Sequence, residues 1–473
     1  MGSNFVGFSN NFQVSPSRPY FEVNNKKIVY IFDPPHLLKA TRNMFFQHKF
    51  KLNEDLIEKK YLVSFYNQDS TCNLRLAPKL TYPHIYPNAF QKMRVYLAAQ
   101  TFSATVAAGM ETYLALNKLP ISSKQTINFF KDMDKLFDIF NSYKRPNLKD
   151  FNRPFKNTQS QNSHLLFMEQ FFTNLKVFDK NNKDVTNRMK FIKGWLVSIA
   201  GLNLLWTILK RESPSHNYVL YTNRLNQDRI ENLFGTFRNQ NGNNMNPTPV
   251  QFYYAFKKIF CLNYFQHSEN SNCIQDFDDI LSEIPDPSNK EIQNIMFPEK
   301  SPFKFKTPLT IGSVDYRDLS LPDQNSLTYV CGYLMKKCLE KHSCDVCINY
   351  AKFQQDLDQS FLFSHFKAYT NKQNSTYGNL LMPHHDFYNY IYNLESVFIH
   401  RFPILAPEIE VGKKLKLSMF SIIYNHPCES FDKDYLLNLF VRFRIFSTIK
   451  FLNKDFFSEK SLKKRKLATL QHL

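Results

Sequence analysis

The sequence predicts an α/β protein in which helices outnumber strands. A short apolar run from Ile28 to Phe32 has the length of a buried strand. Downstream, Phe90, Met93 and Leu97 recur at helical spacing. With 473 residues, of which 43% are hydrophobic and 21% charged, the chain is long enough for roughly two to four domains with sizeable cores.

The predicted strand is preceded by the turn-like Asn24-Asn25-Lys26-Lys27. It ends at Asp33, which is followed by Pro34-Pro35. A lone carboxylate at the end of a buried strand occurs in metal-dependent nucleases, and it is also a common position for an acid that caps a turn. From about residue 53 to 142 the pattern is helical, and its Ala-rich part continues to Leu116. Residues 143–163 are polar and rich in turn-forming types, which predicts an exposed loop.

Helices are expected again over residues 164–210. The longest apolar stretch, Trp195 to Leu209, is interrupted by Ser198, Gly201 and Asn203 and is too short to cross a bilayer. We therefore expect a buried helix and no membrane span. The first residues lack the basic start and continuous apolar core of a signal peptide, so we expect a cytosolic or nuclear chain whose eight cysteines are reduced.

A helix is also expected from Asp228 to Arg238, followed by another from Val250 to Ile259. Glu231, beside the apolar face of the first helix, is a second acid of interest. On spacing alone, this segment fits an amphipathic surface helix with no catalytic role. The residues at i, i+3, i+4 and i+7 are Ile230, Leu233, Phe234 and Phe237.

The rest of the chain is a polar connector at 268–325 and then a helical, aromatic-rich region that ends in Lys463 to Lys466. The net charge of +19 favours a polyanionic partner, with nucleic acid ahead of anionic membrane. The basic run fits nuclear import, DNA backbone contact or a solvated chain end. Phe252 to Lys258 mixes rings and lysines, which suits stacking on bases but equally fits a core-facing aromatic stripe.

Cysteines form one short motif, Cys344-Asp345-Val346-Cys347, with Cys338 and His342 just before it. This spacing is typical of half a zinc site. A second Cys-x-x-Cys pair is lacking in the sequence, and Cys331 and Cys428 are the other candidates in this region. Buried free thiols are the alternative interpretation. His36, after the double proline, is expected to be a structural hydrogen-bonding residue.

Read in order, several segments resemble the P-element family of DNA transposases, which includes the THAP-domain-containing transposases of animals. The order of the motifs matches that family from about residue 4 to 350. The segments are Pro19 to Val23, Phe32 to Lys39, Leu76 to Thr81, Lys92 to Val95 with Ala98 to Gln100, Asp134 to Asp138 with Asn141, Leu225 to Asp228 with Glu231-Asn232, Asn246 to Thr248, and Val330 to Leu334.

This resemblance implies an RNase H-like core that is incomplete at its N-terminus and is interrupted by a mostly helical GTP-binding insertion. A helical, basic C-terminal region follows the core. The implied boundaries are 1–45 for the first part of the core, 46–195 for the insertion, 196–300 for the second part of the core and 301–473 for the C-terminal domain.

In the family, three core acids bind two Mg²⁺ or Mn²⁺ ions for DNA strand cleavage and joining. Asp33 matches the second acid and Glu231 the third. Two neighbouring divalent ions need several carboxylates to offset their charge. The family's first acid and its zinc-binding THAP module lie upstream of the segments matched here. We therefore expect this polypeptide alone to be a weak or inactive catalyst, as a truncated or domesticated product or an incomplete gene model.

The resemblance assigns GTP to the insertion, as a cofactor that the family does not hydrolyse. A carboxylate such as Asp138 accepts hydrogen bonds from guanine N1 and N2, which adenine cannot supply, while Lys79 and Arg94 can meet phosphate charge. The sequence has no Gly-x-x-x-x-Gly-Lys-Ser/Thr loop, so a P-loop hydrolase is not expected. The nucleotide-binding residues implied by the family are Lys79, Arg94, Val95, Ser103, Asp138 and Asn141, with Asp228 reaching in from the flanking helix.

The function expected from the resemblance is that of a P-element-like transposase fragment. Its partners would be DNA, at transposon ends and target, together with GTP and further copies of the same chain. Nuclear localisation follows from the DNA substrate. The alternative is a catalytically inactive derivative that binds DNA or GTP and regulates transposition.

Overall fold

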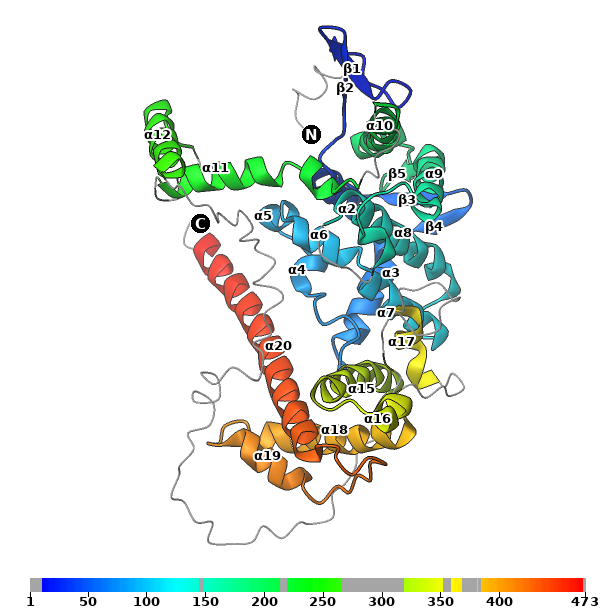
Figure 1. Cartoon of the computed structure of the whole chain (residues 1–473), viewed down its shortest axis with the longest axis vertical. Coiled ribbons are helices and arrows are strands. Elements are labelled where there is room, and N and C mark those ends of the chain that lie inside the picture. The colour runs from blue at the N-terminus through cyan, green and yellow to red at the C-terminus, as the bar shows by residue number, and fades with distance from the viewer. Residues whose placement is uncertain are drawn as a thin grey trace. The chain divides into compact units, whose positions relative to one another are not determined.

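The structure is a computed structural model with two compact units, Met1–Asn226 with Val314–Leu473, and Gln227–Ser313. Each unit is described by itself (Figure 1). Of residues 262–265 and 452–470 only the backbone is described. The residues described are 11–143, 149–212, 219–240, 242, 244, 246–265, 319–351, 359–367, 381 and 384–470.

A β-hairpin opens the first unit. Strands β1 (Tyr20–Val23) and β2 (Lys26–Val29) pair antiparallel. Asn24 and Asn25 form the two-residue turn, with φ angles of 49° and 60°. Asn tolerates this left-handed region, and two such residues match the twist of a tight hairpin. The turn predicted at these asparagines is therefore confirmed.

The prediction that the strand runs on to Asp33 is wrong. After Val29 the chain leaves the hairpin and lies along helix α10 (Lys190–Glu212). The backbone N–H of Phe32 donates to Ser198 Oγ at 3.0 Å, instead of to a neighbouring strand. An apolar run of five residues fits burial against a helix as well as burial in a sheet, which is why the sequence pattern did not separate the two.

Gly201 allows this close approach of the chain to α10. A Cβ at this position would lie 2.5 Å from the carbonyl oxygen of Tyr30, which belongs to the backbone and cannot rotate away. We expect Gly201→Ala to destabilise the protein by about 1 to 3 kcal/mol, the usual cost of overpacking.

The measurement for Gly201→Ala is urea unfolding of the purified chain. Gly235→Ala is the matched control, because a Cβ there meets nothing within 4 Å. In the control, the better helix propensity of alanine should leave stability unchanged or raise it by up to about 1 kcal/mol. Equal stabilities of the two variants would contradict the close approach.

A three-stranded antiparallel sheet has the order β4-β3-β5. Phe50 pairs with Ile57 and with Val177, and all three side chains are buried. The prediction of helix alone over these segments missed β4 and β5, since strands of three or four residues are too short to show a clear period. The strands are β3 (Lys49–Leu52), β4 (Asp55–Ile57) and β5 (Leu175–Phe178).

Helices pack around this sheet and form an aromatic core. Phe45 contacts the rings of Phe50, Phe102, Phe129 and Phe130, with centroids 5.6 to 6.1 Å apart. Edge-on and tilted pairs at this distance add to the stabilisation from burial. The helices of this part are α2 (Pro34–Gln47), α3 (Lys59–Asp69), α4 (Tyr82–Ile85), α5 (Ala89–Lys92), α6 (Val95–Thr101), α7 (Ala104–Ala115), α8 (Lys124–Phe140) and α9 (Gln159–Asn174).

Two details of the helical prediction are wrong. Phe90 and Met93 do not continue one helix with Leu97, because α5 ends before Met93 and α6 starts at Val95; Phe90 and Met93 are 76% and 65% exposed. The predicted loop at 143–163 is shorter than expected, since Thr158 caps α9 and its side chain accepts from the N–H of Gln161.

Helix α10 contains the apolar stretch predicted to be a buried helix. By length and composition it is the one described helix long and apolar enough to cross a membrane. Its Trp195 is fully buried in the aromatic core and donates from Nε1 to Thr41 Oγ1 at 3.0 Å. Packing of this kind is ordinary for a core helix of a globular domain.

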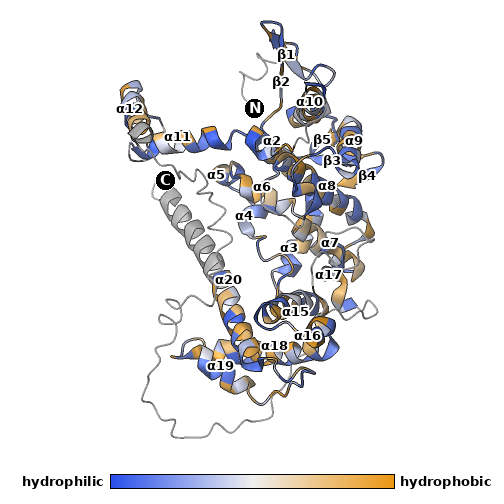
Figure 2. Cartoon of the chain, viewed as in Figure 1, coloured by the Kyte–Doolittle hydropathy of each residue, from blue (hydrophilic) through white to orange (hydrophobic). Residues whose placement is uncertain are grey.

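The later part of the first unit is a second helical layer with its own core. Leu334 of α15, Leu394 of α18 and Phe440 of α20 are fully buried in it. Helix α19 and the described part of α20 carry both hydrophilic and hydrophobic residues, as expected for helices packed on one side (Figure 2). The helices of this layer are α15 (Leu321–Lys341), α16 (Asp345–Ala351), α18 (His385–Leu405), α19 (Val411–Met419) and α20 (Lys433–Leu470). Helix α17 (Leu362–Lys367) packs on α7 instead, and its Phe363 is buried in the first core.

This layer confirms the prediction of a helical C-terminal region. The predicted connector at 268–325 lies outside the described residues up to 318, and α15 already begins at Leu321. The basic run at 463–466 lies within the backbone of α20, and its side chains are outside the described part of the chain.

The second unit contains α11 (Asp228–Gln240) and α12 (Pro249–Phe265), which confirms both predicted helices. Phe237 is buried against Ala255 and Ile259. The other members of the predicted apolar stripe are exposed, Ile230 by 55% and Leu233 by 46%. The helical period was therefore correct, but most of that face is not core.

Candidate functional site

Asp33 is the N-cap of α2. Its Oδ2 accepts a hydrogen bond from the backbone N–H of His36 at 3.0 Å and lies 2.5 Å from His36 Nδ1. The Asp33 side chain is only 6% exposed, whereas His36 is 41% exposed. An N-cap carboxylate satisfies a free N–H of the first turn and interacts favourably with the helix dipole. The expected structural hydrogen bond of His36 is confirmed, and its partner is Asp33.

Asp228 and Glu231 lie in the first turn of α11, in the second unit, and both are exposed. Acids at this position stabilise a helix through its dipole. Asp33 and the other nucleotide-binding candidates belong to the first unit, whereas Asp228 and Glu231 belong to the second.

The C-terminal end of α8 carries a compact polar cluster, which we call the Asp138 cluster. Both Asp138 oxygens are used: Oδ1 accepts from Asn152 Nδ2 at 3.1 Å, and Oδ2 accepts from Lys149 Nζ at 2.9 Å. The same ammonium reaches Asp134 Oδ2 at 2.8 Å. Asn141 completes the cluster, since its backbone oxygen accepts from Asn152 at 3.3 Å.

Burial and the nearby Asp134 carboxylate raise the pKa of Asp138 to about 7, and Lys149 and Asn152 oppose this rise. The Asp138 side chain is 14% exposed. A raised pKa in a partly buried polar group is common at binding sites, although ion-pair networks also produce it. The side chain of Asn141 accepts from Asn226 Nδ2 at 3.1 Å, so the segment before α11 also reaches the cluster.

Three lysines share the region beside this cluster. Lys367, at the end of α17, lies over the Tyr329 ring at 3.8 Å. Burial lowers the pKa of Lys367 to about 8, and the charges of Lys79 and Lys149 lower it further. The charges of Lys79 and Lys149 thus disfavour the charged form of Lys367, and an anion beside Lys367 would be stabilised.

Lys79 itself is exposed and lies on the loop between α3 and α4. A buried ion pair holds this loop: Arg75 Nε lies 3.1 Å from Asp69 Oδ2. Asp69 also accepts from the N–H groups of Leu76 and Ala77, and Arg75 donates to the carbonyl of Leu80 at 2.7 Å. The loop that presents Lys79 is therefore fixed at several points.

The remaining nucleotide candidates flank α6. Arg94 is its N-cap, Val95 its first residue and Ser103 the N-cap of α7. Arg94 is exposed and donates to Tyr96 Oη at 3.0 Å, while Ser103 Oγ accepts from Val106 N–H. The interactions described for these residues are local, and none of them reaches the Asp138 cluster.

The aromatic and basic segment of α12 presents most of its rings outward. Tyr253, Tyr254 and Phe256 are 50 to 64% exposed. Lys257 and Lys258 are exposed as well. The alternative of a core-facing stripe is therefore wrong for most of this segment, which has the combination of π-faces and ammonium groups that suits single-stranded nucleic acid.

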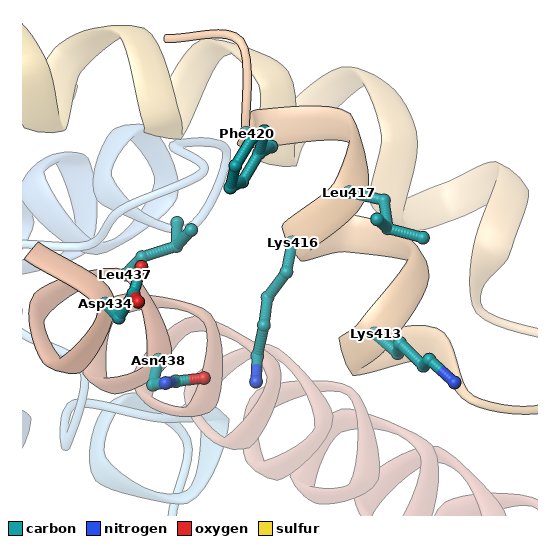
Figure 3. Close-up of a pocket in the computed structure, with 7 residues that line it drawn as sticks. All are labelled: Lys413, Lys416, Leu417, Phe420, Asp434, Leu437 and Asn438. Atoms are coloured by element: carbon teal, nitrogen blue, oxygen red, sulfur yellow. The ribbon is translucent and has the colours of Figure 1, made fainter. Parts of the chain in front are cut away.

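A groove of about 290 Å³ lies between α19 and α20. Figure 3 shows Lys416 extending toward α20, with Phe420 at the other end of the groove. Burial lowers the pKa of Lys416, and the nearby Arg442 adds to this effect. The groove offers positive charge and apolar surface, and its lining is Lys413, Lys416, Leu417, Phe420, Asp434, Leu437 and Asn438.

The seven cysteines in the described part of the chain are all free thiols. Cys344 and Cys347 lie together with His342 and Cys428. Cys338 is buried in the second core and is not a member of this group.

Comparison with known proteins identifies two segments. Residues 35–154 match the family model of the TNP-like GTP-binding insertion domain, and residues 223–257 match that of the TNP-like RNase H C-terminal domain. The Transposable element P transposase of Drosophila melanogaster is 27% identical over 449 residues, which cover 93% of this chain and 55% of that protein. The chain is related to the P-element transposases.

A further relative and a solved structure agree with this relationship. Human DNA transposase THAP9 is 25% identical over 361 residues, covering 71% of this chain and 38% of that protein. The solved Drosophila P element transposase strand transfer complex matches with 29% identity and a TM-score of 0.50, covering 56% of this chain and 59% of that chain. This chain therefore spans 55% of the length of the Drosophila transposase and 38% of the length of human THAP9.

The two matched segments contain different candidate residues. The GTP-binding insertion match includes Lys79, Arg94 and Asp138, and the RNase H C-terminal match includes Asp228 and Glu231. Asp33 lies just before the first match. The P-element resemblance did not point to Lys149, Asn152 or Lys367, and the only signal in the sequence for Lys149 and Asn152 was the polar composition of residues 143–163.

Proposed function

We propose that this chain binds GTP with its insertion domain, as a structural cofactor that it does not hydrolyse. The observation that carries the proposal is the Asp138 cluster within the segment matched by the GTP-binding family model. Two protein donors, on Lys149 and Asn152, already occupy the two oxygens of Asp138. Guanine supplies two donors of its own, N1–H and N2–H, and would take their places.

The lysines beside the cluster suit the other end of the nucleotide. Displaced from Asp138, Lys149 would join Lys79 and Lys367, whose charges already act on one another. A triphosphate would neutralise this group of ammonium ions. Arg94 would add a bidentate phosphate contact, with Val95, Ser103 and Asn141 as further contacts and Asp228 approaching from α11.

The GTP-bound chain would act on DNA, at transposon ends and target, together with further copies of itself in the nucleus. The net charge of +19 and the exposed rings and lysines of α12 support a nucleic-acid partner. The Lys463 to Lys466 run would serve import or backbone contact. In this proposal the chain is a DNA- and GTP-binding regulator of transposition.

Strand cleavage and transfer is the second candidate, favoured by the RNase H C-terminal match around Glu231. In that case Asp33 and Glu231 would hold Mg²⁺ or Mn²⁺, which would activate the attacking oxygen. The residues of the first unit fit this poorly, because Asp33 Oδ2 already caps α2 and contacts His36. Metal-dependent nicking of terminal-repeat DNA that is lost in Glu231→Gln would establish catalysis and overturn the regulator proposal.

GTP affinity should increase as the pH rises from about 6 to 8. Only the ionised Asp138 carboxylate accepts from both guanine donors, and its pKa is raised to about 7. Protonation at pH 6 would therefore weaken binding, by about tenfold relative to pH 8. Isothermal titration calorimetry at each pH measures this change.

Asp138→Asn is the control for the pH experiment, because an amide does not titrate. The variant should bind GTP weakly at every pH. The same pH profile in the wild type and the variant would show that another group is responsible.

A further inference from the structure

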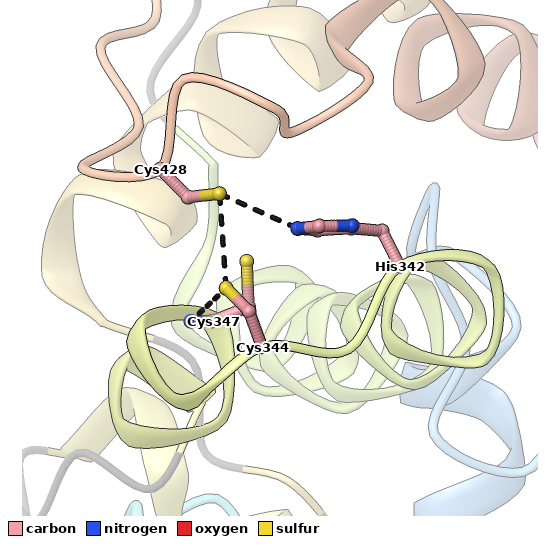
Figure 4. A group of neighbouring side chains, drawn as sticks. All are labelled: His342, Cys344, Cys347 and Cys428. Carbon is pink, nitrogen blue, oxygen red and sulfur yellow. Dashed lines mark hydrogen bonds between the residues drawn. The ribbon is translucent and has the colours of Figure 1, made fainter.

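Four potential metal ligands converge in the helical C-terminal layer. His342 follows the last residue of α15, Cys344 precedes α16, Cys347 lies within α16 and Cys428 lies on the segment between α19 and α20. One ligand atom from each, three Sγ and an imidazole nitrogen, lie within 4.8 Å of one another. Figure 4 shows the four side chains pointing toward a common centre.

The distances fit a shared ion better than a disulfide. The Sγ atoms of Cys344 and Cys428 are 3.8 Å apart. Two sulfurs that each lie about 2.3 Å from one tetrahedral zinc ion are separated by about 3.8 Å. A disulfide would need about 2.05 Å. His342 Nε2 lies 3.4 Å from Cys428 Sγ, which also fits two ligands of one ion.

One further contact links the two segments that carry the ligands, and two lie within those segments. Lys341, beside His342, forms an ion pair of 2.6 Å with Asp432, four residues after Cys428. The backbone N–H of Cys428 donates to His426 Nδ1 at 3.1 Å, and the N–H of Cys347 donates to Cys344 Sγ at 3.5 Å. An N–H···S bond of this kind stabilises a thiolate.

We propose that His342, Cys344, Cys347 and Cys428 form a structural zinc site. Three thiolates and one imidazole are a common ligand set of structural zinc, and they close the tetrahedron with no open position for a substrate. The cysteines bind as thiolates, so protons that they carry are released to solvent as the ion enters.

The ion would join segments that are distant in the sequence. His342, Cys344 and Cys347 come from the junction of α15 and α16, whereas Cys428 belongs to the segment that leads into α20. A shared zinc ion would therefore link the junction of α15 and α16 to the segment just before α20, the longest helix of the second helical layer. Because metal ligation is formed in the folded state, binding free energy adds to the stability of this layer.

The first test is the zinc content of the full chain, purified from zinc-supplemented cells and dialysed, measured by mass spectrometry. We expect about one zinc per chain. Cys428→Ser and Cys344→Ser should each lose it. Cys338→Ala is the matched control, because Cys338 is a nearby buried cysteine outside the group, and it should keep the ion. Zinc retained in Cys428→Ser, or absent from wild-type protein, would overturn the proposal.

The second test does not depend on the folding of the serine variants. Co²⁺ added to the metal-free wild-type chain should give the ligand-field bands of a tetrahedral site with thiolate charge transfer. His342→Cys should still bind, with charge-transfer intensity raised from three thiolates to four. An octahedral Co²⁺ spectrum, or a Cys344–Cys428 disulfide found by peptide mapping of freshly purified protein that was never stripped of metal, would exclude the zinc site.

Discussion

Asp69→Ala should lower the free energy of unfolding by about 3 to 5 kcal/mol, as expected when one partner of a buried ion pair is removed. Asp69 is fully buried and Arg75 is 5% exposed on its side chain. Burial raises the pKa of the Asp69 carboxyl, while Arg75 and the N–H groups of Leu76 and Ala77 oppose that rise. The substitution leaves the Arg75 charge and both N–H groups without this acceptor.

The effect of Asp69→Ala should also reach the nucleotide site. Residues 75–80 include Lys79, so loosening the loop should weaken GTP binding and increase hydrogen exchange of the Leu76 and Ala77 amides. Urea unfolding and hydrogen exchange measure the two consequences. Glu54→Ala is the control, since Glu54 is 93% exposed beside Lys51 and its loss should change stability by less than about 1 kcal/mol. A loss below about 1 kcal/mol for Asp69→Ala would be inconsistent with a buried pair that holds this loop.

Arg444→Leu should also lower the free energy of unfolding by about 3 to 5 kcal/mol. Arg444 Nε lies 2.6 Å from Glu395 Oε2, with side-chain exposures of 4% and 0%. The guanidinium and the carboxylate form a buried ion pair, and Glu395 Oε1 has no hydrogen bond among the described residues. Burial raises the pKa of Glu395, and Arg444 counteracts this.

A double-mutant cycle separates the cost of an unpaired charge from the cost of lost packing. Glu395→Leu with Arg444→Leu removes both charges, so we expect it to be more stable than either single variant. Lys337→Ala, in the exposed Lys337–Glu340 pair of the same layer, is the control. Simple additivity of the two single losses would show that the charges do not depend on one another.

Local patterns in the sequence predicted local structure well. The Asn24-Asn25 turn and the helices at α11 and α12 follow from turn chemistry and from helical period, which depend on neighbouring residues alone. The strand end at Asp33 could not be predicted, because the partner of Phe32 is Ser198, on a distant helix. Strands β3 and β4 were missed because they are too short to show a clear period, and β5 was missed also because it pairs with a distant segment, β3.

The candidate site shows the same division. Asp138 and Asn141 lie on one helix end, and their spacing let the family motif identify both. Lys149 and Lys367 arrive from other segments and meet Asp138 or Lys79 only in the fold. The Cys344-x-x-Cys347 motif likewise indicated half a metal site, and its partner Cys428 could not be selected from the sequence.

The central claim is that Asp138 recognises guanine, and calorimetric titration of the purified chain with GTP, ATP and XTP tests it most directly. We expect wild-type protein to bind GTP and not ATP. Asp138→Asn should lose GTP and gain XTP, since the Asn amide donates to the oxygen that replaces the guanine N2 amino group in xanthine. Equal binding of GTP and ATP, or unchanged GTP binding in Asp138→Asn, would contradict the account.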